Sequence, residues 1–197
     1  PNRFLGGADT GSYTSTIYGF YARGGINATN PWLAEFAKET GIDSAAFCPI
    51  SYRISDAKRG LLSPSFPAGF ALMAAPFYEL FRSHFNDLDA IYILYQFCGL
   101  WSLLLIVALA TRLGGAGAGF LAALFLSGNW LQLWLSRSAY NEIPLQTFSL
   151  AIIFAVVLAI TSAAPRVFLV AAVLTAALFP VKIEGLLLLP ALWMALP

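Results

Sequence analysis

Charge and cysteine are both scarce in this chain of 197 residues. Only 11% of the residues are Asp, Glu, Lys or Arg, against about 25% in an average soluble domain, and 59% are apolar. Two cysteines, Cys48 and Cys98, are too few for a disulfide framework. The one histidine, His84, has no cysteine close to it and gives no zinc signature. The composition predicts an integral membrane protein, and a net charge of +1 without a basic run points to no nucleic-acid partner.

The charges that remain divide the chain into two parts. Residues 1–88 carry most of them, and we interpret this part as a long loop on the outer, non-cytoplasmic side of the membrane. Residues 89–197 form a transmembrane helical region, because long apolar runs alternate there with short polar turns. The chain starts at Pro1 and stops within an apolar run, so we take it as a fragment.

Apolar runs in the second part define the expected spans. They cover residues 90–111, 118–135, 143–161 and 167–179, and a fifth run starts near residue 186 and is cut short. Counting spans puts the turns at 112–117 and 163–166 on the inner side, and those at 137–142 and 181–185 on the outer side. The expected fold is an all-α polytopic membrane protein, with interfacial amphipathic helices in the outer loop followed by about five transmembrane helices.

The outer loop has helical periodicity of its own. Residues 9–24 and 68–81 predict two helices too short to span, of the kind that lies in the membrane interface. The stretch 30–60 is predicted to be irregular, apart from one short helix near 33–40. The side chains expected to face apolar surroundings are Tyr13, Ile17, Phe20, Phe70, Phe77 and Phe81.

Four short motifs occur in a fixed order along the chain. They are Gly6-Gly7-Ala8-Asp9 with Tyr13, the turn at 65–69 before a helix that ends in Leu80-Phe81, Ser136-Arg137 with Glu142-Ile143-Pro144, and Lys182-Ile183-Glu184-Gly185. In this order they resemble membrane glycosyltransferases of the GT-C class, such as lipid A aminoarabinose transferases and protein O-mannosyltransferases. The resemblance implies that Asp9 is the catalytic residue, in the first outer loop.

The residue types fit sugar transfer from a polyprenyl phosphate. Such a reaction needs a carboxylate to accept a proton, which would be Asp9, and cations for the phosphate, which would be Arg137 and Lys182. Glu142 and Glu184 would position those cations or hold a divalent metal, and Tyr13 belongs to the same substrate-binding set. No cofactor is identified beyond that metal. The spans and interfacial helices would form the groove for the lipid.

The expected function is therefore transfer of a sugar from a polyprenyl-phosphate donor to an acceptor on the non-cytoplasmic face, in a bacterial inner membrane. The partners would be the lipid bilayer, the lipid-linked sugar and other membrane subunits. Two other functions stay open: a non-catalytic subunit with the same scaffold, and a transporter with its site at the break 180–185. Asp9 would then be a helix cap, and the acid–base pairs Arg137/Glu142 and Lys182/Glu184 would be interfacial.

Overall fold

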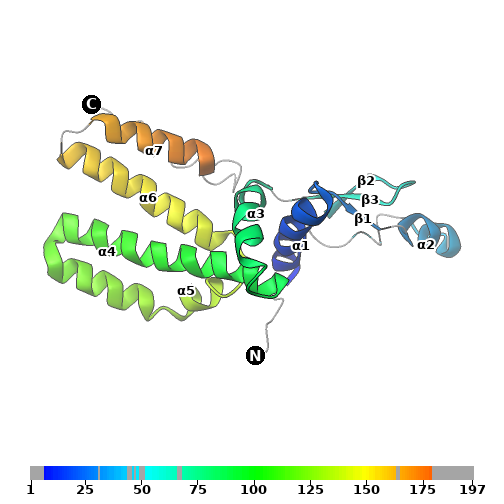
Figure 1. Ribbon diagram of the computed structural model, residues 1–197, viewed down its shortest axis with the longest axis horizontal. Helices are drawn as coiled ribbons and strands as arrows, with labels where there is room; N and C mark the ends of the chain where they lie inside the picture. The colour runs from blue at the N-terminus through cyan, green and yellow to red at the C-terminus, as the bar shows by residue number, and fades with distance from the viewer. Residues whose placement is uncertain are drawn as a thin grey trace. The chain divides into compact units, whose positions relative to one another are not determined.

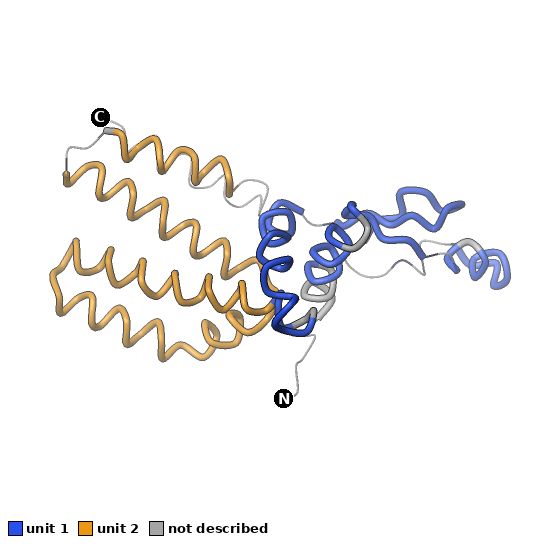
Figure 2. Tube along the Cα trace, in the orientation of Figure 1, with its two compact units in different colours: residues 1–91 blue, residues 92–197 orange. Residues whose placement is uncertain are grey.

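The computed structural model describes residues 7–30, 32–43, 46, 48, 52–65, 68–162 and 165–178. The chain separates into two compact units, residues 1–91 and residues 92–197, which Figure 2 colours blue and orange. Each unit has its own packed helices.

Two helices form the centre of the first unit. Helix α1 runs over Gly7–Arg23 and α3 over Gly69–Phe81, and the two pack against each other. Both were predicted from the spacing of their apolar residues. The prediction that Tyr13, Ile17 and Phe70 lie in apolar surroundings agrees with their burial, which leaves no more than 8% of each residue exposed.

Phe77 is 46% exposed and lies outside the buried face of α3, so its predicted apolar surroundings are not tested by burial within the chain. The buried face of α3 is set by Phe70, Ala74 and Tyr78, which recur at four-residue intervals. Phe77 follows Phe70 by seven residues, but it lies on the edge of this stripe beside the exposed Met73. Phe20 and Phe81 are half-buried.

A three-stranded antiparallel sheet corrects the all-α prediction. Strands β1 (Ala28–Thr29), β2 (Tyr52–Asp56) and β3 (Leu61–Pro64) lie in the order β1-β3-β2. The turn between β2 and β3 is closed by Asp56, whose Oδ1 accepts hydrogen bonds from the backbone N–H groups of Lys58 and Arg59. Gly60 then takes a positive φ of 61°, where glycine has no steric cost. The segment predicted to be irregular thus contains a hairpin.

Helix α2 (Trp32–Thr40) lies between β1 and β2 in the chain and matches the short helix predicted there. Asn30 places its start: its Oδ1 accepts from the N–H of Trp32. The same residue donates its own backbone N–H to the carbonyl of Gly60. Asn30 therefore ties the beginning of α2 to the hairpin.

Among the described residues, the second unit is built on a helical hairpin followed by helices α5, α6 and α7 (Figure 1). Helix α4 covers Asp87–Ser127, but it reverses at Gly115, which has φ 80° and ψ −179°. Only glycine adopts this backbone region without strain. Gly119 lies so close to Thr111 on the preceding segment that a Cβ there would collide with the threonine side chain. The two glycines therefore permit the reversal and the close packing after it.

The second predicted span is not one continuous helix. The second segment of α4 ends at Ser127, and a new short helix, α5 (Trp130–Leu135), begins after Gly128 and Asn129. The Asn129 side chain accepts hydrogen bonds from the N–H groups of Leu131 and Gln132, which caps α5. A glycine followed by a strong cap residue thus interrupts the apolar run.

Helices α6 (Glu142–Thr161) and α7 (Pro165–Leu178) pack along each other. A hydroxyl cluster joins α6 to the first segment of α4. The Ser102 and Thr147 hydroxyls are 2.8 Å apart, and Thr147 Oγ1 donates to a backbone carbonyl nearby. Such hydrogen bonds hold helices together where water is excluded.

Within the described part of the chain, two helices are long and apolar enough to cross a membrane: Asp89–Ser127 and Glu142–Thr161. The first of these contains the reversal at Gly115. Helix α7 is apolar but shorter, and the expected fifth span lies outside the described residues. The chain is mostly helical and integral to the membrane, while the number of five spans stays a prediction.

Candidate functional site

Helix α1 carries the predicted catalytic aspartate. Asp9 is the third residue of α1, so it falls in the first turn and not at the cap position in front of the helix. Partial positive charge from the helix dipole favours a carboxylate in a first turn. Tyr13 follows one turn later and is buried, with 8% of the residue exposed. The helix therefore places both residues along one side at its N-terminal end.

The predicted phosphate-binding arginine lies in the second unit, in the turn between α5 and α6. The backbone N–H of Arg137 donates to the Trp134 carbonyl at 3.1 Å, so the turn continues directly from α5. The Arg137 side chain is exposed. Asn141, four residues later, is fully buried and holds the turn against the unit.

Glu142 is the first residue of α6, where a helix dipole favours an acid, and it is half-buried. Among the described residues, no ion pair joins Arg137 to Glu142. The interpretation of these two residues as interfacial charges stays a prediction, because it does not require a direct contact between them.

The two ends of the second unit carry different groups. Arg112, at the reversal of α4, donates hydrogen bonds from its guanidinium to the hydroxyls of Thr161 and Ser162, at the C-terminal end of α6. Glu142 begins the other end of this helix, which is 20 residues long, and Arg137 lies in the turn before it. At 1.5 Å per residue, α6 separates the two ends by about 30 Å. The turns at 112 and 137 therefore lie at opposite ends of α6, while the membrane side of each stays a prediction.

A pocket of about 350 Å³ lies beside Arg137. Its walls come from the first segment of α4, the end of the second segment, α5 and the turn after α5. They are Gln96, Gly99, Leu100, Leu103, Leu126, Ser127, Gln132, Leu133, Ser136 and Arg137. Gly99 closes one side against Ser136, since a Cβ on Gly99 would come within 2.8 Å of the serine Cβ.

Four leucines give the pocket an apolar wall, and two glutamines, two serines and one arginine give it a polar one. A ligand with an apolar chain and an anionic head matches this division. The sequence prediction included Arg137 but missed Gln96 and Gln132. Each is an amide within or beside an otherwise apolar run, which is the signal that singles it out.

The remaining predicted residues are only partly accounted for. Lys182 and Glu184 lie outside the described residues. Asp9 and Tyr13 belong to the first unit, and Arg137 and Glu142 belong to the second. Among the described residues, no group of three or more His, Cys, Asp and Glu side chains is placed to hold a metal.

The apolar helices and the composition define the class: an integral, mostly helical membrane protein. A family model described as dolichyl-phosphate-mannose-protein mannosyltransferase matches residues 65–196, which is well over half of the chain. The chain therefore belongs to this family of membrane glycosyltransferases, and the predicted resemblance is confirmed. No curated protein and no solved structure matches the chain. The match includes Arg137 and Glu142, whereas Asp9 and Tyr13 precede it.

Proposed function

We propose that the chain belongs to an enzyme that transfers a sugar from a polyprenyl-phosphate donor to an acceptor hydroxyl on the non-cytoplasmic face of the membrane. The observation that carries this proposal is the pocket beside Arg137. Its leucine wall suits an isoprenoid chain, and the exposed guanidinium suits a phosphate, which arginine binds in bidentate geometry. Membership of the mannosyltransferase family supports the same type of donor.

In the proposed reaction, the Asp9 carboxylate accepts the proton of the acceptor hydroxyl. The hydroxyl oxygen attacks the anomeric carbon of the donor sugar, and the bond from that carbon to the phosphate oxygen breaks. The polyprenyl phosphate leaves with the bonding electrons, and Arg137 and Lys182 stabilise its charge. Tyr13 lines the acceptor side, because it shares a helix and a face with Asp9.

Glu142 and Glu184 are assigned to positioning the cations. Their carboxylate oxygens are also the ligand type that Mg²⁺ and Mn²⁺ prefer, and such a metal would add positive charge at the leaving phosphate. Glu142 lies one residue after the buried Asn141, on a helix end that is fixed by packing. That rigidity is the property expected of a residue that orients a charged neighbour.

The proposed orientation follows the distribution of arginines. Arg112 and Arg166 lie at one end of the second unit and would face the cytoplasm, in agreement with the excess of cations usual there. Residues 1–88, Arg137 and Glu142 would lie on the non-cytoplasmic side, in a bacterial inner membrane. Asp9 and Arg137 come from different units, so the proposal requires the two to converge.

The test is Asp9→Asn in the full-length protein, assayed with a polyprenyl-phosphate sugar. We expect the transfer rate to fall by about 10²–10⁴, because the general base is lost. Stability should change by no more than about 1 kcal/mol, which is the contribution of a first-turn carboxylate to a helix. Asp43→Asn, at an exposed carboxylate after α2, is the matched control and should keep wild-type activity.

Transfer by the Asp9→Asn protein at the wild-type rate would remove Asp9 from the mechanism. If the wild-type protein transfers nothing from any lipid-linked donor, the enzyme proposal fails. The non-catalytic subunit, with the family scaffold and without its chemistry, would then be the better interpretation.

A further inference from the structure

A cluster of aromatic and charged side chains joins the C-terminal parts of α1 and α3. The ring of Tyr78 meets Tyr18 and Tyr21 edge-on, with centroids 6.4 Å and 5.2 Å apart. Tyr78 is almost completely buried, at 2% exposed. Edge-to-face contacts of this kind fix relative orientation as well as distance. The cluster lies outside the residues assigned above to catalysis and substrate binding.

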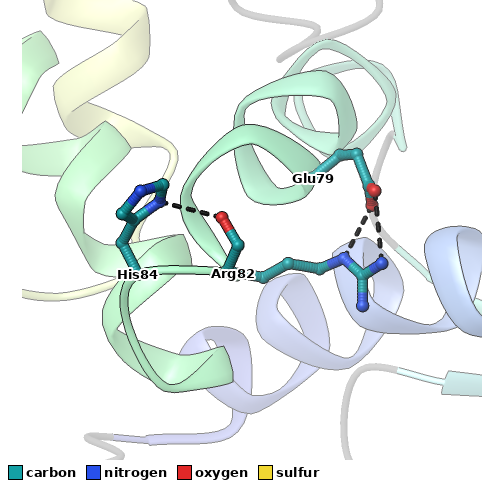
Figure 3. Close-up of polar contacts among 4 residues, drawn as sticks. Glu79, Arg82 and His84 are labelled. Atoms are coloured by element: carbon teal, nitrogen blue, oxygen red, sulfur yellow. Dashed lines mark hydrogen bonds and ion pairs between the residues drawn. The ribbon is translucent and has the colours of Figure 1, made fainter.

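Arg82, the residue after α3, completes this cluster, and Figure 3 shows its guanidinium turned toward the Glu79 carboxylate. Its Nε and a terminal nitrogen donate to the two carboxylate oxygens of Glu79, at 2.8 Å and 3.2 Å. The guanidinium carbon also lies 4.3 Å from the centre of the Tyr21 ring. The two hydrogen bonds to Glu79 hold the guanidinium plane in one orientation, and that plane lies over the Tyr21 ring of α1.

Glu79 in turn contacts Tyr21. Hydrogen bonds from Arg82 and then from the Tyr21 hydroxyl lower the pKa of the Glu79 carboxyl below its ordinary value of 4.5. The carboxylate is therefore ionised at neutral pH, and it links Arg82 and Tyr21 through a charge. Arg82, just after α3, thus contacts the ring of Tyr21, and Glu79, on α3, contacts its hydroxyl.

Helix α1 has a second fixed point near its middle. The Tyr52 hydroxyl, from β2, donates to Ser15 Oγ at 3.0 Å. Ser15 lies equally far along the helix from Asp9 and from Tyr21. If α1 moves as a rigid rod about Ser15, a shift at Tyr21 produces a shift of similar size at Asp9. A misplacement of about 1 Å at a reacting group can cost about 10²-fold in rate.

We propose that Arg82, held by Glu79 and stacked on Tyr21, is a positioning residue that sets the angle of α1 and so the place of the Asp9 carboxylate. This inference rests on the function proposed above. Glu79 and Arg82 are half-exposed, at 50% and 41%, and such ion pairs contribute little to global stability. Their effect is expected in the geometry of α1.

The test is Arg82→Lys, which keeps the charge and removes the fork and the flat surface for stacking. We expect kcat per folded molecule to fall at least about tenfold, with KM for the lipid donor unchanged, since Arg137 is untouched. Arg59→Lys is the matched control: Arg59 also pairs with an acid three residues away, Asp56, but at the tip of an exposed hairpin. It should keep the wild-type kcat.

Combining Arg82→Lys with Glu79→Gln should add little to either single change, because the two residues act as one unit. Additive losses, or equal losses in Arg82→Lys and Arg59→Lys, would overturn the proposal. So would a fall in activity that only reflects less folded protein.

Amide hydrogen exchange gives a readout that does not depend on activity. Exchange in residues 13–21 should be faster in Arg82→Lys than in the wild type, and unchanged in Arg59→Lys. Unchanged exchange in Arg82→Lys would overturn the coupling. The wild-type protein could transfer no sugar while exchange in α1 is still faster in Arg82→Lys. The control of α1 by Arg82 would then stand, and only the proposed enzymatic function would fail.

Discussion

Arg137 is the residue on which the proposed donor site depends. Its backbone is fixed by the turn from α5, while its guanidinium is exposed beside a wall of leucines. A cation at the border of an apolar surface is costly unless an anion or water reaches it, so such positions favour function. Gln96 and Gln132 add neutral hydrogen-bonding groups to the same pocket without adding charge. A single phosphate head matches one cation and two amides.

We expect Arg137→Gln to raise KM for a polyprenyl-phosphate sugar by about 10- to 100-fold. Hydrogen bonds to charged groups are worth about 1.5–3 kcal/mol, and about 1.4 kcal/mol corresponds to a factor of ten. Arg166→Gln, at the exposed first turn of α7, should leave KM unchanged. Steady-state kinetics over a range of donor concentrations make the comparison. An unchanged KM in Arg137→Gln would place the phosphate elsewhere.

At the scale of elements, the reversal of α4 decides what the second unit can be. The chain turns back through one residue, Gly115, whose φ of 80° and ψ of −179° exclude a side chain. Two residues later, Gly117 has open space around its Cα and no unusual φ. Gly115 needs glycine for its backbone angles and Gly117 does not, so an alanine at 117 is a matched control for an alanine at 115.

Gly115→Ala should destabilise the protein by about 1–3 kcal/mol, because alanine is strained in this backbone region. Gly117→Ala should instead be neutral or stabilise by up to about 1 kcal/mol, since alanine limits the unfolded chain and favours the helix. Thermal unfolding in one detergent, followed for both variants and the wild type, measures the difference. Equal unfolding temperatures for the two variants would argue against the reversal at Gly115.

At the scale of the whole molecule, the sequence predicted the long elements and missed the ones that depend on distant partners. The apolar run at 143–161 predicted α6 to within a residue, because length and hydropathy are local properties. The sheet was missed because β1 has two residues and pairs with Leu61 and Leu62, far along the chain. Gly128 followed by Asn129 is a pattern that indicates a helix break, but the apolar residues on both sides of it led us to predict one continuous span.

The candidate site shows the same limit. Arg137 and Glu142 stand out as charges between apolar runs, and the sequence singled them out for that reason. It could not reveal that the two do not form an ion pair, since that depends on how the turn 136–141 folds against α6. Nor could it place Gln96 beside Gln132, because only the packing of the α4 hairpin against α5 brings them to one pocket.

The proposed orientation predicts a labelling pattern in intact cells. In a background with Cys48→Ser and Cys98→Ala, a membrane-impermeant maleimide should label Asn27→Cys and Gly128→Cys, which are exposed and lie on the proposed outer side. Leu113→Cys, exposed at the Arg112 end, should be labelled only after the cells are opened. Labelling of all three in intact cells, or of Leu113→Cys alone, would contradict the orientation.

The returning segment of α4 has a consequence for the lipid around it. After the reversal at Gly115 it covers residues 116–127, which are twelve residues, and at 1.5 Å per residue it rises about 18 Å. A full hydrocarbon layer is about 30 Å thick. A helix that falls short of that thickness draws the headgroup layer toward it. We therefore expect the bilayer to be thinner beside Gly128, and the sugar-phosphate head of the proposed donor would then reach the pocket from the side while its isoprenoid chain stays in the hydrocarbon layer.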